Sequence, residues 1–220
     1  MSEATAKRPQ RADAVRNHAR LLQAANEVFA KRGLGVTLDD VAHHAGVGVG
    51  TVYRHFAGKD ELINAVFEQN FAAMAEAADE ATTGEEPWQA LVEYFEFACE
   101  RMAGSRGMTE VLNRGGCDQV TAQHLRIEAA VATLVQRAQS SGSLRPDAHP
   151  DDFFGVVFSV GALADVTRQI NPDAWRRHLA LLLDGLNNDH RPRRPLPGRA
   201  GSMRQVHHTG DRAGGGPDCL

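Results

Sequence analysis

The chain of 220 residues has little of several features that mark other classes of protein. Aromatic residues make up only 6% of it, and alanine is the most frequent apolar residue, which favours helix over sheet. There is no run of about 18 apolar residues, so we expect no membrane-spanning helix. The polar N-terminal segment 1–16 has no apolar stretch behind its basic residues, so we expect no secretory signal and a cytoplasmic protein.

Cysteine is also scarce, and its spacing matches no common metal motif. The three cysteines are Cys99, Cys117 and Cys219. We expect free thiols, as is usual in reducing cytosol; a redox or metal sensor formed with His124 is the alternative, which no spacing favours. The neighbouring His43 and His44 make a poor metal pair, because adjacent helical side chains point about 100° apart. We therefore expect no metal and no cofactor.

Motifs of catalysis are missing as well. The sequence has no nucleophile elbow, no HExxH, no phosphate-binding loop and no pair of catalytic carboxylates. Glu93, Glu96 and Glu100 share one helical stripe, which a solvated helix face explains. We expect that the protein is not an enzyme. A helical enzyme and a helical interaction module without DNA affinity are the distant alternatives.

Charge is distributed unevenly along the chain. Residues 1–60 carry nine Lys and Arg against six Asp and Glu, a balance of +3. Residues 61–189 carry nine against twenty, a balance of −11, and residues 190–220 carry six against two, a balance of +4. A basic head on an acidic body indicates that a polyanion would be bound at the N-terminal end.

Periodicity predicts an all-α protein of about nine helices. In successive segments apolar residues recur every three or four positions, and glycine- or proline-containing breaks separate these segments. There is no internal repeat and no convincing strand. The fold class is therefore predicted as three N-terminal helices followed by a helical bundle.

The stretch from Thr37 to Lys59 has the layout of a helix-turn-helix, whose second helix enters the DNA major groove. Thr37 fits an N-cap, with Asp40 three residues on as an acidic variant of the capping box. Gly46 suits the left-handed position that ends the first short helix. A second short helix is predicted over Thr51–Phe56, and Lys59 opens a third helix. The pattern predicts a DNA-binding head.

The same region resembles the DNA-binding domain of the tetracycline-repressor (TetR) family of bacterial transcription regulators. The residues that carry the resemblance are Ala25, Phe29, Gly33, Thr37, Val41, Ala42, Ala45, Gly46 and Val47, then the run Gly50–Phe56, and Lys59, Asp60, Glu61 and Leu62. Beyond Phe71 the chain is similar to the family only in length and helical pattern.

With this resemblance, the chain divides into four parts. Residues 1–10 are predicted to be a flexible arm, and 11–71 a TetR-type DNA-binding domain with its motif at about 37–56. Residues 72–188 are predicted to form a regulatory and dimerisation domain, and 189–220 a disordered tail rich in arginine, proline and glycine.

The resemblance implies that Thr51, Tyr53 and Lys59 approach DNA phosphates. Lys59 and Thr37 each lie at a predicted helix N-terminus, where N–H groups and the helix dipole already favour an anion. Such contacts fix the position of the protein on DNA without reading its sequence.

Bases would be read from the exposed face of the second short helix, by Val49, Gly50, Arg54 and His55. Arg54 is the strongest candidate, because its fork matches the O6/N7 edge of guanine; a grip on phosphate is the alternative. Val49 can only pack on a thymine methyl. Many family members have serine where Gly48 stands, and glycine supplies neither its capping oxygen nor its side-chain contact to phosphate.

The resemblance further implies a ligand pocket among the helices between Leu62 and Gln139, and a two-fold dimer formed by the last two helices. The candidate pocket residues are Phe67, Phe71, Met74, Trp88, Phe95, Cys99, Met102, Leu112 and His124. The candidate dimer residues are Phe154, Phe158, Leu163, Trp175, Leu179, Leu182 and Leu183. Core packing is the alternative role for every pocket candidate.

The predicted function is therefore that of a dimeric repressor, released from a palindromic DNA operator by a small-molecule effector. Its expected partners are double-stranded DNA, a second copy of the chain and the effector, without a membrane. The expected location is the bacterial cytoplasm, at the nucleoid through DNA binding. An activator or a ligand-independent regulator of the same fold is the nearer alternative.

Overall fold

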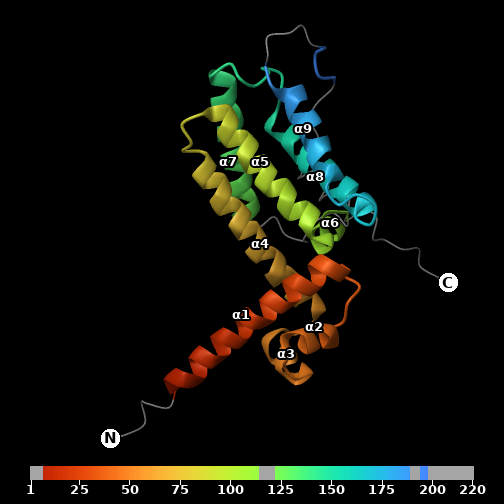
Figure 1. Cartoon of the computed structure of the whole chain (residues 1–220). Helices are drawn as coiled ribbons and strands as arrows, with labels where there is room; N and C mark the ends of the chain where they lie inside the picture. Colours follow the sequence, from red (N-terminus) through yellow and green to blue (C-terminus); the bar gives the residue numbers. More distant parts are fainter. Residues whose placement is uncertain (1–6, 114–121, 189–193, 198–220) are drawn as a thin grey trace, which may run out of the picture. The chain divides into compact units, whose positions relative to one another are not determined.

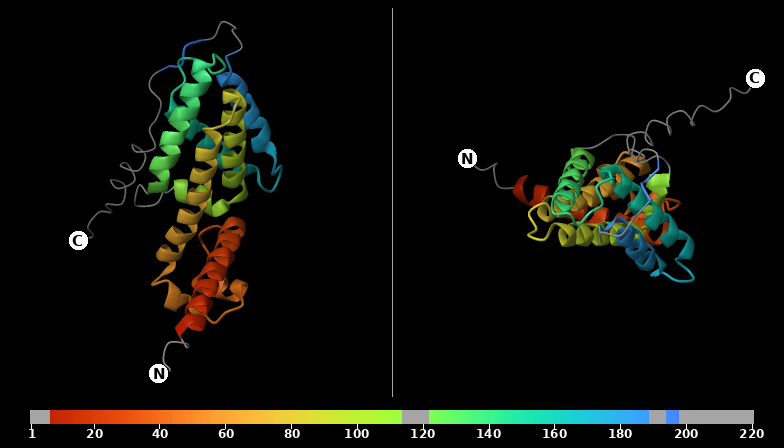
Figure 2. Two further views of the ribbon diagram at one scale, coloured as in Figure 1. Left: turned by 90° about the vertical axis from the view of Figure 1, so that its left-hand side faces the viewer. Right: turned by 90° about the horizontal axis from the view of Figure 1, so that it is seen from above.

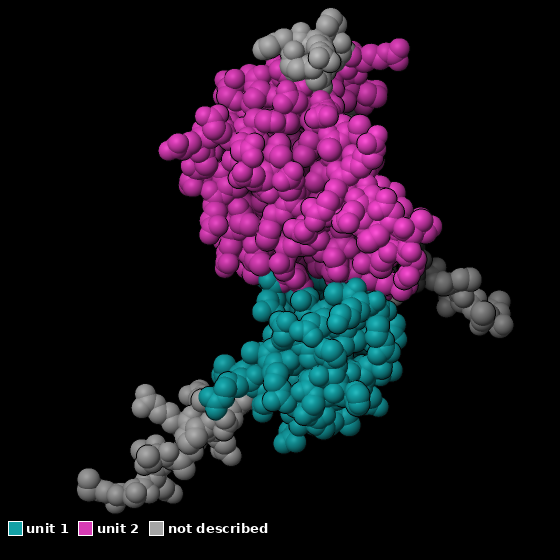
Figure 3. All heavy atoms as spheres, viewed as in Figure 1, with its two compact units in different colours: residues 1–69 teal, residues 70–220 magenta. Residues whose placement is uncertain are grey.

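A computed structural model describes residues 7–113, 122–188 and 194–197, and within these ranges the chain forms α-helices and no strand (Figure 1). The predicted all-α fold is confirmed. Side chains are described from Val15 onward, except those of Leu112 and Asn113. The chain separates into two compact units, one ending at Gln69 and the other beginning at Asn70 (Figure 3).

The first unit contains three helices and the start of a fourth. These are α1 (Lys7–Arg32), α2 (Leu38–Ala45), α3 (Val49–His55) and α4 (Lys59–Ala81), which continues into the second unit. Because α1 begins at Lys7, the last four residues of the predicted arm are helical, and 1–6 lie outside the described residues. The core of this unit is apolar: Leu21, Ala25, Phe29, Val41, Val52, Phe56, Leu62 and Val66 are buried.

Helix α2 is held at both ends by its own sequence. Its N-cap Thr37 accepts a hydrogen bond from the Asp40 backbone N–H at 3.2 Å, and Asp40 accepts one from the Thr37 N–H at 2.8 Å. This reciprocal pair is the predicted capping box. At the other end Gly46 has φ +65°, a left-handed conformation that a residue with a Cβ adopts at a cost.

The turn after α2 is tied to α1 by a residue that the sequence did not single out. Nη2 of Arg20 donates to the carbonyl of Ala45 at 3.0 Å and to that of Gly46 at 3.4 Å. Helix α3 then begins at Val49, two residues earlier than predicted. Its N-cap Gly48 makes no side-chain hydrogen bond, as its lack of a side chain requires.

The second unit is a bundle of the remaining helices. These are the C-terminal part of α4, α5 (Pro87–Gly104), α6 (Arg106–Asn113), α7 (Ala122–Ser140), α8 (Pro150–Thr167) and α9 (Ala174–Leu186). Helix α5 packs against both α7 and α8, and α9 packs against α8 (Figures 1 and 2). The interior side chains come from all the long helices, among them Phe71, Leu91, Phe95, Met102, Leu134, Phe153 and Val160. Among the described helices, none is long and apolar enough to cross a membrane.

The buried Arg145 and its partner Asp147 form hydrogen bonds with the segment that follows α9. Arg145 is only 9% exposed and pairs through two nitrogens with Asp147, at 2.6 and 2.9 Å. Its Nη2 also donates to the carbonyl of Arg194 at 2.9 Å, and Asp147 accepts from the N–H of Leu196 at 3.0 Å. Arg194 and Leu196 are thus hydrogen-bonded to Arg145 and Asp147, while the disorder of residues 189–220 stays a prediction. Residues 189–193 and 198–220 lie outside the described residues.

The two glycines that bound the turn predict opposite outcomes for the same substitution. Gly46→Ser should destabilise the protein by about 1 kcal/mol, because its φ of +65° disfavours any side chain. Gly48→Ser should stabilise it by a few tenths of a kcal/mol, because Gly48 has φ −70°, has open space around it and gains a capping hydroxyl. Urea unfolding followed by circular dichroism measures both. Equal effects of the two substitutions would contradict this account of the turn.

Candidate DNA-binding surface and ligand cavity

Helix α3 has one buried and one exposed face. Val52 is fully buried and anchors the helix, while Val49 and Tyr53 are exposed, the latter by 58%. Gly50 and Arg54 also lie on the exposed face. The structure therefore places four predicted DNA-contacting residues together on one accessible surface of the first unit.

Arg54, the predicted base reader, is folded back along its own helix. Its Nε donates to the carbonyl of Gly50 at 3.1 Å. That bond uses neither terminal nitrogen of the guanidinium, and these are the atoms that pair with the guanine edge. The backbone contact thus restrains the base of the fork and is compatible with base reading.

Three of the remaining predicted contact residues are less exposed, whereas Thr37 and Gly48 are exposed. Thr51 and His55 are half-buried, and His55 lies against the ring of His18 from α1, with centroids 5.6 Å apart. His18 also stacks on Phe56 at 5.0 Å. His55 therefore supports the end of α3 as well as bordering its exposed face. Lys59 is half-buried at the first position of α4.

The N-terminus of α4 differs from the simple anion site that the sequence suggests. Asp60 and Glu61 stand in its first turn, and the Glu61 carboxylate accepts a hydrogen bond from the N–H of Ala57. A negative group of the protein therefore already benefits from this helix end. A phosphate at this end of α4 would lie close to the carboxylates of Asp60 and Glu61, so the ammonium group of Lys59 would have to offset their repulsion.

Two charged side chains, Asp40 and Arg32, lie beside Thr37. The Thr37 hydroxyl donates to Asp40 at 2.7 Å, and Arg32 of α1 donates to the same carboxylate at 2.9 Å. Hydrogen bonds from the backbone and hydroxyl of Thr37, and then from Arg32, lower the pKa of Asp40 to about 2. The carboxylate is thus held ionised beside a candidate phosphate contact.

A second polar contact joins α1 and α2. Nε2 of His44 lies 2.8 Å from a carboxylate oxygen of Glu27, whose other oxygen accepts from Gln23 at 2.8 Å. The His44 and Gln23 hydrogen bonds lower the pKa of Glu27. Among the described residues no three His, Cys, Asp or Glu side chains gather as a metal site would need.

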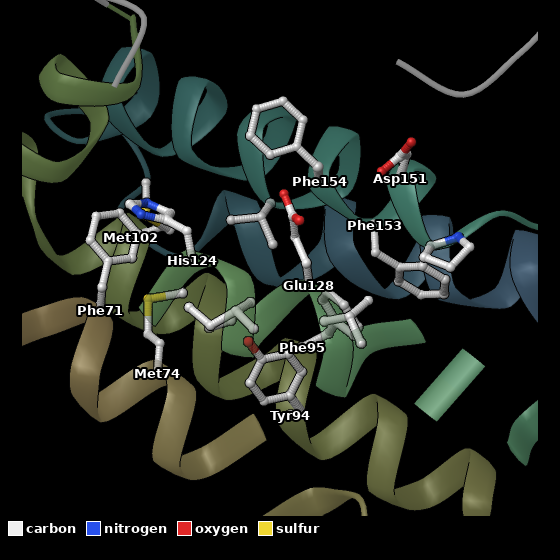
Figure 4. A pocket seen from close by; sticks show the side chains of 15 residues that line it. Phe71, Met74, Tyr94, Phe95, Met102, His124, Glu128, Asp151, Phe153 and Phe154 are labelled. Atoms are coloured by element: carbon white, nitrogen blue, oxygen red, sulfur yellow. The ribbon is translucent and has the colours of Figure 1, made fainter. Parts of the chain in front are cut away.

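The second unit contains a cavity of about 320 Å³ (Figure 4). Helices α4, α5, α7 and α8 all contribute to its wall. The lining residues are Phe71, Met74, Tyr94, Phe95, Ala98, Met102, His124, Ile127, Glu128, Val131, Pro150, Asp151, Phe153, Phe154 and Val157. A volume of this size is at the lower end of the range that holds a small organic ligand.

Five of the predicted pocket residues line this cavity: Phe71, Met74, Phe95, Met102 and His124. Three do not: Phe67 is buried within the first unit, Trp88 is half-buried elsewhere on α5, and Cys99 is buried in the bundle. The side chain of Leu112 lies outside the described residues. Burial raises the pKa of the Cys99 thiol to about 12, so it is a poor thiolate former and behaves as a small apolar core residue.

The sequence missed the polar groups of the cavity other than His124. Glu128 follows His124 by one helical turn, so α7 presents both on the face that also carries Ile127 and Val131. An acidic residue at an otherwise apolar helical position was the available signal. His124 is only 4% exposed and lies against Phe71, with ring centroids 4.1 Å apart. Tyr94 is buried, which raises the pKa of its hydroxyl and keeps it neutral.

The predicted dimer residues fall into two groups. Trp175, Leu179 and Leu183 of α9 are buried within a single chain, because this face of α9 packs inward. They are core residues of the single chain and expose almost no surface that a second subunit could contact. Phe154 also serves within the chain, in the wall of the cavity. Phe158 is exposed, and Leu163 and Leu182 are half-buried.

Other apolar side chains of this region are more exposed than the predicted ones. On α8 and just after it, Val166 and Ile170 are 78% and 86% exposed, and on α9 Leu181 is 60% exposed. Phe158 is a further exposed apolar side chain of α8. Exposed apolar side chains, where they gather in one patch, are typical of an interface with another chain.

Two protein-family models match the chain, one in each of its compact units. The family model of bacterial regulatory proteins of the tetR family matches residues 21–66. The model of the SbtR-like transcriptional regulator C-terminal domain matches residues 86–188. The two matches lie on either side of the boundary between the compact units.

Individual relatives are similar over different extents. The chain is 32% identical over 126 residues to the HTH-type transcriptional regulator SrpR of Pseudomonas putida, spanning 57% of this chain and 59% of SrpR. It is 32% identical over 126 residues to the uncharacterized HTH-type transcriptional regulator TtgW of the same species, spanning 57% of this chain and 93% of TtgW. A TetR transcription regulatory protein from Mycobacterium vanbaalenii is 31% identical with a TM-score of 0.58, covering 81% of this chain and 99% of that structure.

The Asp40 capping box predicts a specific acid sensitivity. Because the folded-state pKa of about 2 lies below the ordinary 3.8, this carboxylate contributes stability that is complete above about pH 4 and is lost as the pH falls toward 2. Asp40→Asn should lower the urea midpoint at pH 7 and flatten its fall between pH 4 and pH 2. Asp39→Asn is the control, since Asp39 is exposed and takes no part in the capping box. An unchanged acid profile in Asp40→Asn would refute this assignment.

Proposed function

Because this chain belongs to the TetR family of bacterial transcriptional regulators, we propose that it is a homodimeric DNA-binding repressor released from its operator by a small molecule. The operator would be nearly palindromic, because a two-fold dimer offers two identical recognition helices. In this proposal residues 11–71 bind DNA and 72–188 hold the ligand and the dimer interface. The protein would act in the cytoplasm and catalyse no reaction.

The observation that carries the proposal is that α4 belongs to both compact units. The helix begins at Lys59 in the first unit, and its later residues Phe71 and Met74 line the cavity of the second. A ligand that displaces Phe71 or Met74 acts on the same rigid helix that carries Lys59. DNA and ligand would then favour different positions of α4, which is the thermodynamic condition for release.

The exposed face of α3 supports the proposed DNA contacts. Arg54, with Val49, Gly50 and His55, would face the bases in the major groove. A further group would position the protein on phosphates: Thr37, Gly48 through its backbone, Thr51, Tyr53 and Lys59. Gly48 offers no hydroxyl, so its share of the phosphate contacts is smaller than a serine would give.

The proposed dimer interface is the apolar outer surface of α8 and α9. Phe158, Leu163 and Leu182 remain candidates, and we add Val166, Ile170 and Leu181 because they are exposed. Burial of these side chains against a second copy would form a four-helix interface. Trp175, Leu179 and Leu183 would support it from beneath.

Substitutions at Arg54 and Lys59 should affect DNA binding differently. Arg54→Ala should relax the preference at one base pair per half-site, at a cost of about 1–3 kcal/mol for the preferred base. Lys59→Ala should weaken binding about equally on all sequences and make the salt dependence shallower. Operators selected from a random DNA pool, and then varied base by base at fixed salt, measure both effects.

The contrast between these two variants decides the role of Arg54. A uniform loss of affinity across all operator variants in Arg54→Ala would show that it grips phosphate instead. Binding that is insensitive to salt in the unmodified protein would contradict the proposed operator complex itself.

Two single substitutions, each of which replaces an exposed leucine by glutamate, test the proposed dimer surface. Leu181→Glu should raise the dissociation constant of the dimer by at least about tenfold, because a charge would be buried in an apolar interface. Leu125→Glu is the matched control, since Leu125 is 47% exposed on α7. Sedimentation velocity across a concentration series measures both. A monomer produced by Leu125→Glu alone would move the interface to α7.

A further inference from the structure

We propose that the cavity of the second unit binds a neutral, lipophilic carbonyl compound, whose oxygen accepts a hydrogen bond from the hydroxyl of Tyr94. This inference rests on the proposed ligand-released function, which leaves the chemistry of the ligand open. It follows from a buried donor without a partner, from the side chains that hold this donor in place and from the polarity of the rest of the cavity wall.

Tyr94 is a buried polar side chain in the middle of α5. It is only 4% exposed, and it lines the cavity. No hydrogen bond joins its hydroxyl to any residue that the structure describes. Buried hydroxyls nearly always have a hydrogen-bond partner, and an exception calls for an explanation. Because the side chain lines the cavity, a ligand that enters the cavity can supply the missing acceptor.

The hydroxyl of Tyr94 is a donor at neutral pH. Burial, and then the nearby Cys99 and Asp79, raise the pKa of Tyr94 well above its usual value, so the proton stays on the oxygen. The carboxylate of Asp79 accepts its hydrogen bond from Arg126, at 2.6 Å, and not from Tyr94. A protonated phenol has one O–H to donate, which selects a ligand with an accepting oxygen such as a carbonyl.

Aromatic contacts fix the position of this donor. The rings of Tyr94 and Phe95 meet edge to face with centroids 5.1 Å apart, and Phe95 in turn lies against Phe153 at 4.6 Å. Figure 4 shows the Tyr94 ring rising from α5 with its oxygen directed toward the side of the cavity where Met74 lies. A donor that is held in place before the ligand arrives loses little side-chain freedom on binding, which favours affinity.

The rest of the cavity wall favours a neutral, apolar ligand. Neither lysine nor arginine is among the fifteen described side chains that line it, so an anionic ligand would lose hydration without gaining a permanently charged partner. His124 and Glu128 already interact with other groups of the protein, and Asp151 is only half-buried, so none of them requires a charged ligand. Apolar side chains make up most of the remaining wall. A lipophilic body with one accepting oxygen matches this wall.

Three probes of similar shape separate the accepting oxygen from hydrophobicity and from charge. The first is the ketone 4-phenylbutan-2-one. The second is the alkene (3-methylbut-3-enyl)benzene, in which a CH2 group replaces the carbonyl oxygen, and the third is the carboxylate 3-phenylpropanoate. Calorimetric titration with the full chain measures their affinities.

Tyr94→Phe should weaken binding of the ketone by about threefold to tenfold, which corresponds to the net contribution of one hydrogen bond. It should leave the affinity for the alkene unchanged or higher, because the alkene cannot accept the O–H. The carboxylate should bind the unmodified protein at least about tenfold more weakly than the ketone, because its charge would be buried without a partner.

Phe154→Leu is the matched control, because Phe154 lines the cavity but has no polar group. It should change the affinities for ketone and alkene by the same factor. The alkene also reports on folding, because a misfolded variant would lose it together with the ketone. A second readout is the carbonyl resonance of carbon-13-labelled ketone, which a hydrogen bond moves downfield. Tyr94→Phe should abolish this shift of the bound ketone.

Five results would overturn the inference. They are an unchanged ketone affinity in Tyr94→Phe, an equal loss of ketone and alkene in that variant, a carbonyl resonance that the substitution does not move, tighter binding of the carboxylate than of the ketone, and no binding of the ketone.

An operator titration with each probe separates the two proposals. A ketone that binds through Tyr94 but leaves operator affinity unchanged supports the ligand class and defeats ligand-driven release. An alkene or carboxylate that lowers operator affinity while the ketone does not supports release and overturns the ligand class.

Discussion

The continuity of α4 is the constraint on which the rest of the proposed function depends. The helix runs from Lys59 to Ala81 with no glycine or proline, so nothing in its sequence supplies a hinge. Leu62 and Val66 bury one part of it in the first unit, while Phe71 and Met74 belong to the cavity of the second. From Lys59 to Phe71 the rise along the axis is about 18 Å. In the proposed function, a ligand that moves Phe71 or Met74 therefore acts on the same continuous helix that begins at Lys59.

The sequence predicted best what depends on neighbours along the chain. The capping box of Thr37 and Asp40, the left-handed Gly46 and the uncapped Gly48 are local arrangements, and each was predicted from residues within a few positions. Helical periodicity likewise gave the all-α fold and most inward faces. The hydrogen bonds of Arg20 to the turn could not be predicted, because they join residues 25 and 26 positions apart.

The cavity shows where periodicity stops being informative. An inward position can end in tight packing, as at Cys99, or beside empty volume, as at Phe95, and the sequence looks the same in both cases. Only the distance between helices decides, and it depends on every side chain between them. For the same reason Trp175 on α9 resembled an interface residue although it is buried within its own chain. The acidic Glu128 in an apolar pattern was the exception that could have been noticed.

The two glycines at the start of the recognition helix have a consequence for evolution and engineering. A Cβ built on Gly48 or Gly50 would meet no atom within 4 Å, and neither residue has the left-handed conformation that disfavours a side chain at Gly46. The proposed DNA-binding surface therefore carries two positions where side chains can be added without disturbing the core. In the proposed function, operator preference can diversify there at little cost in stability.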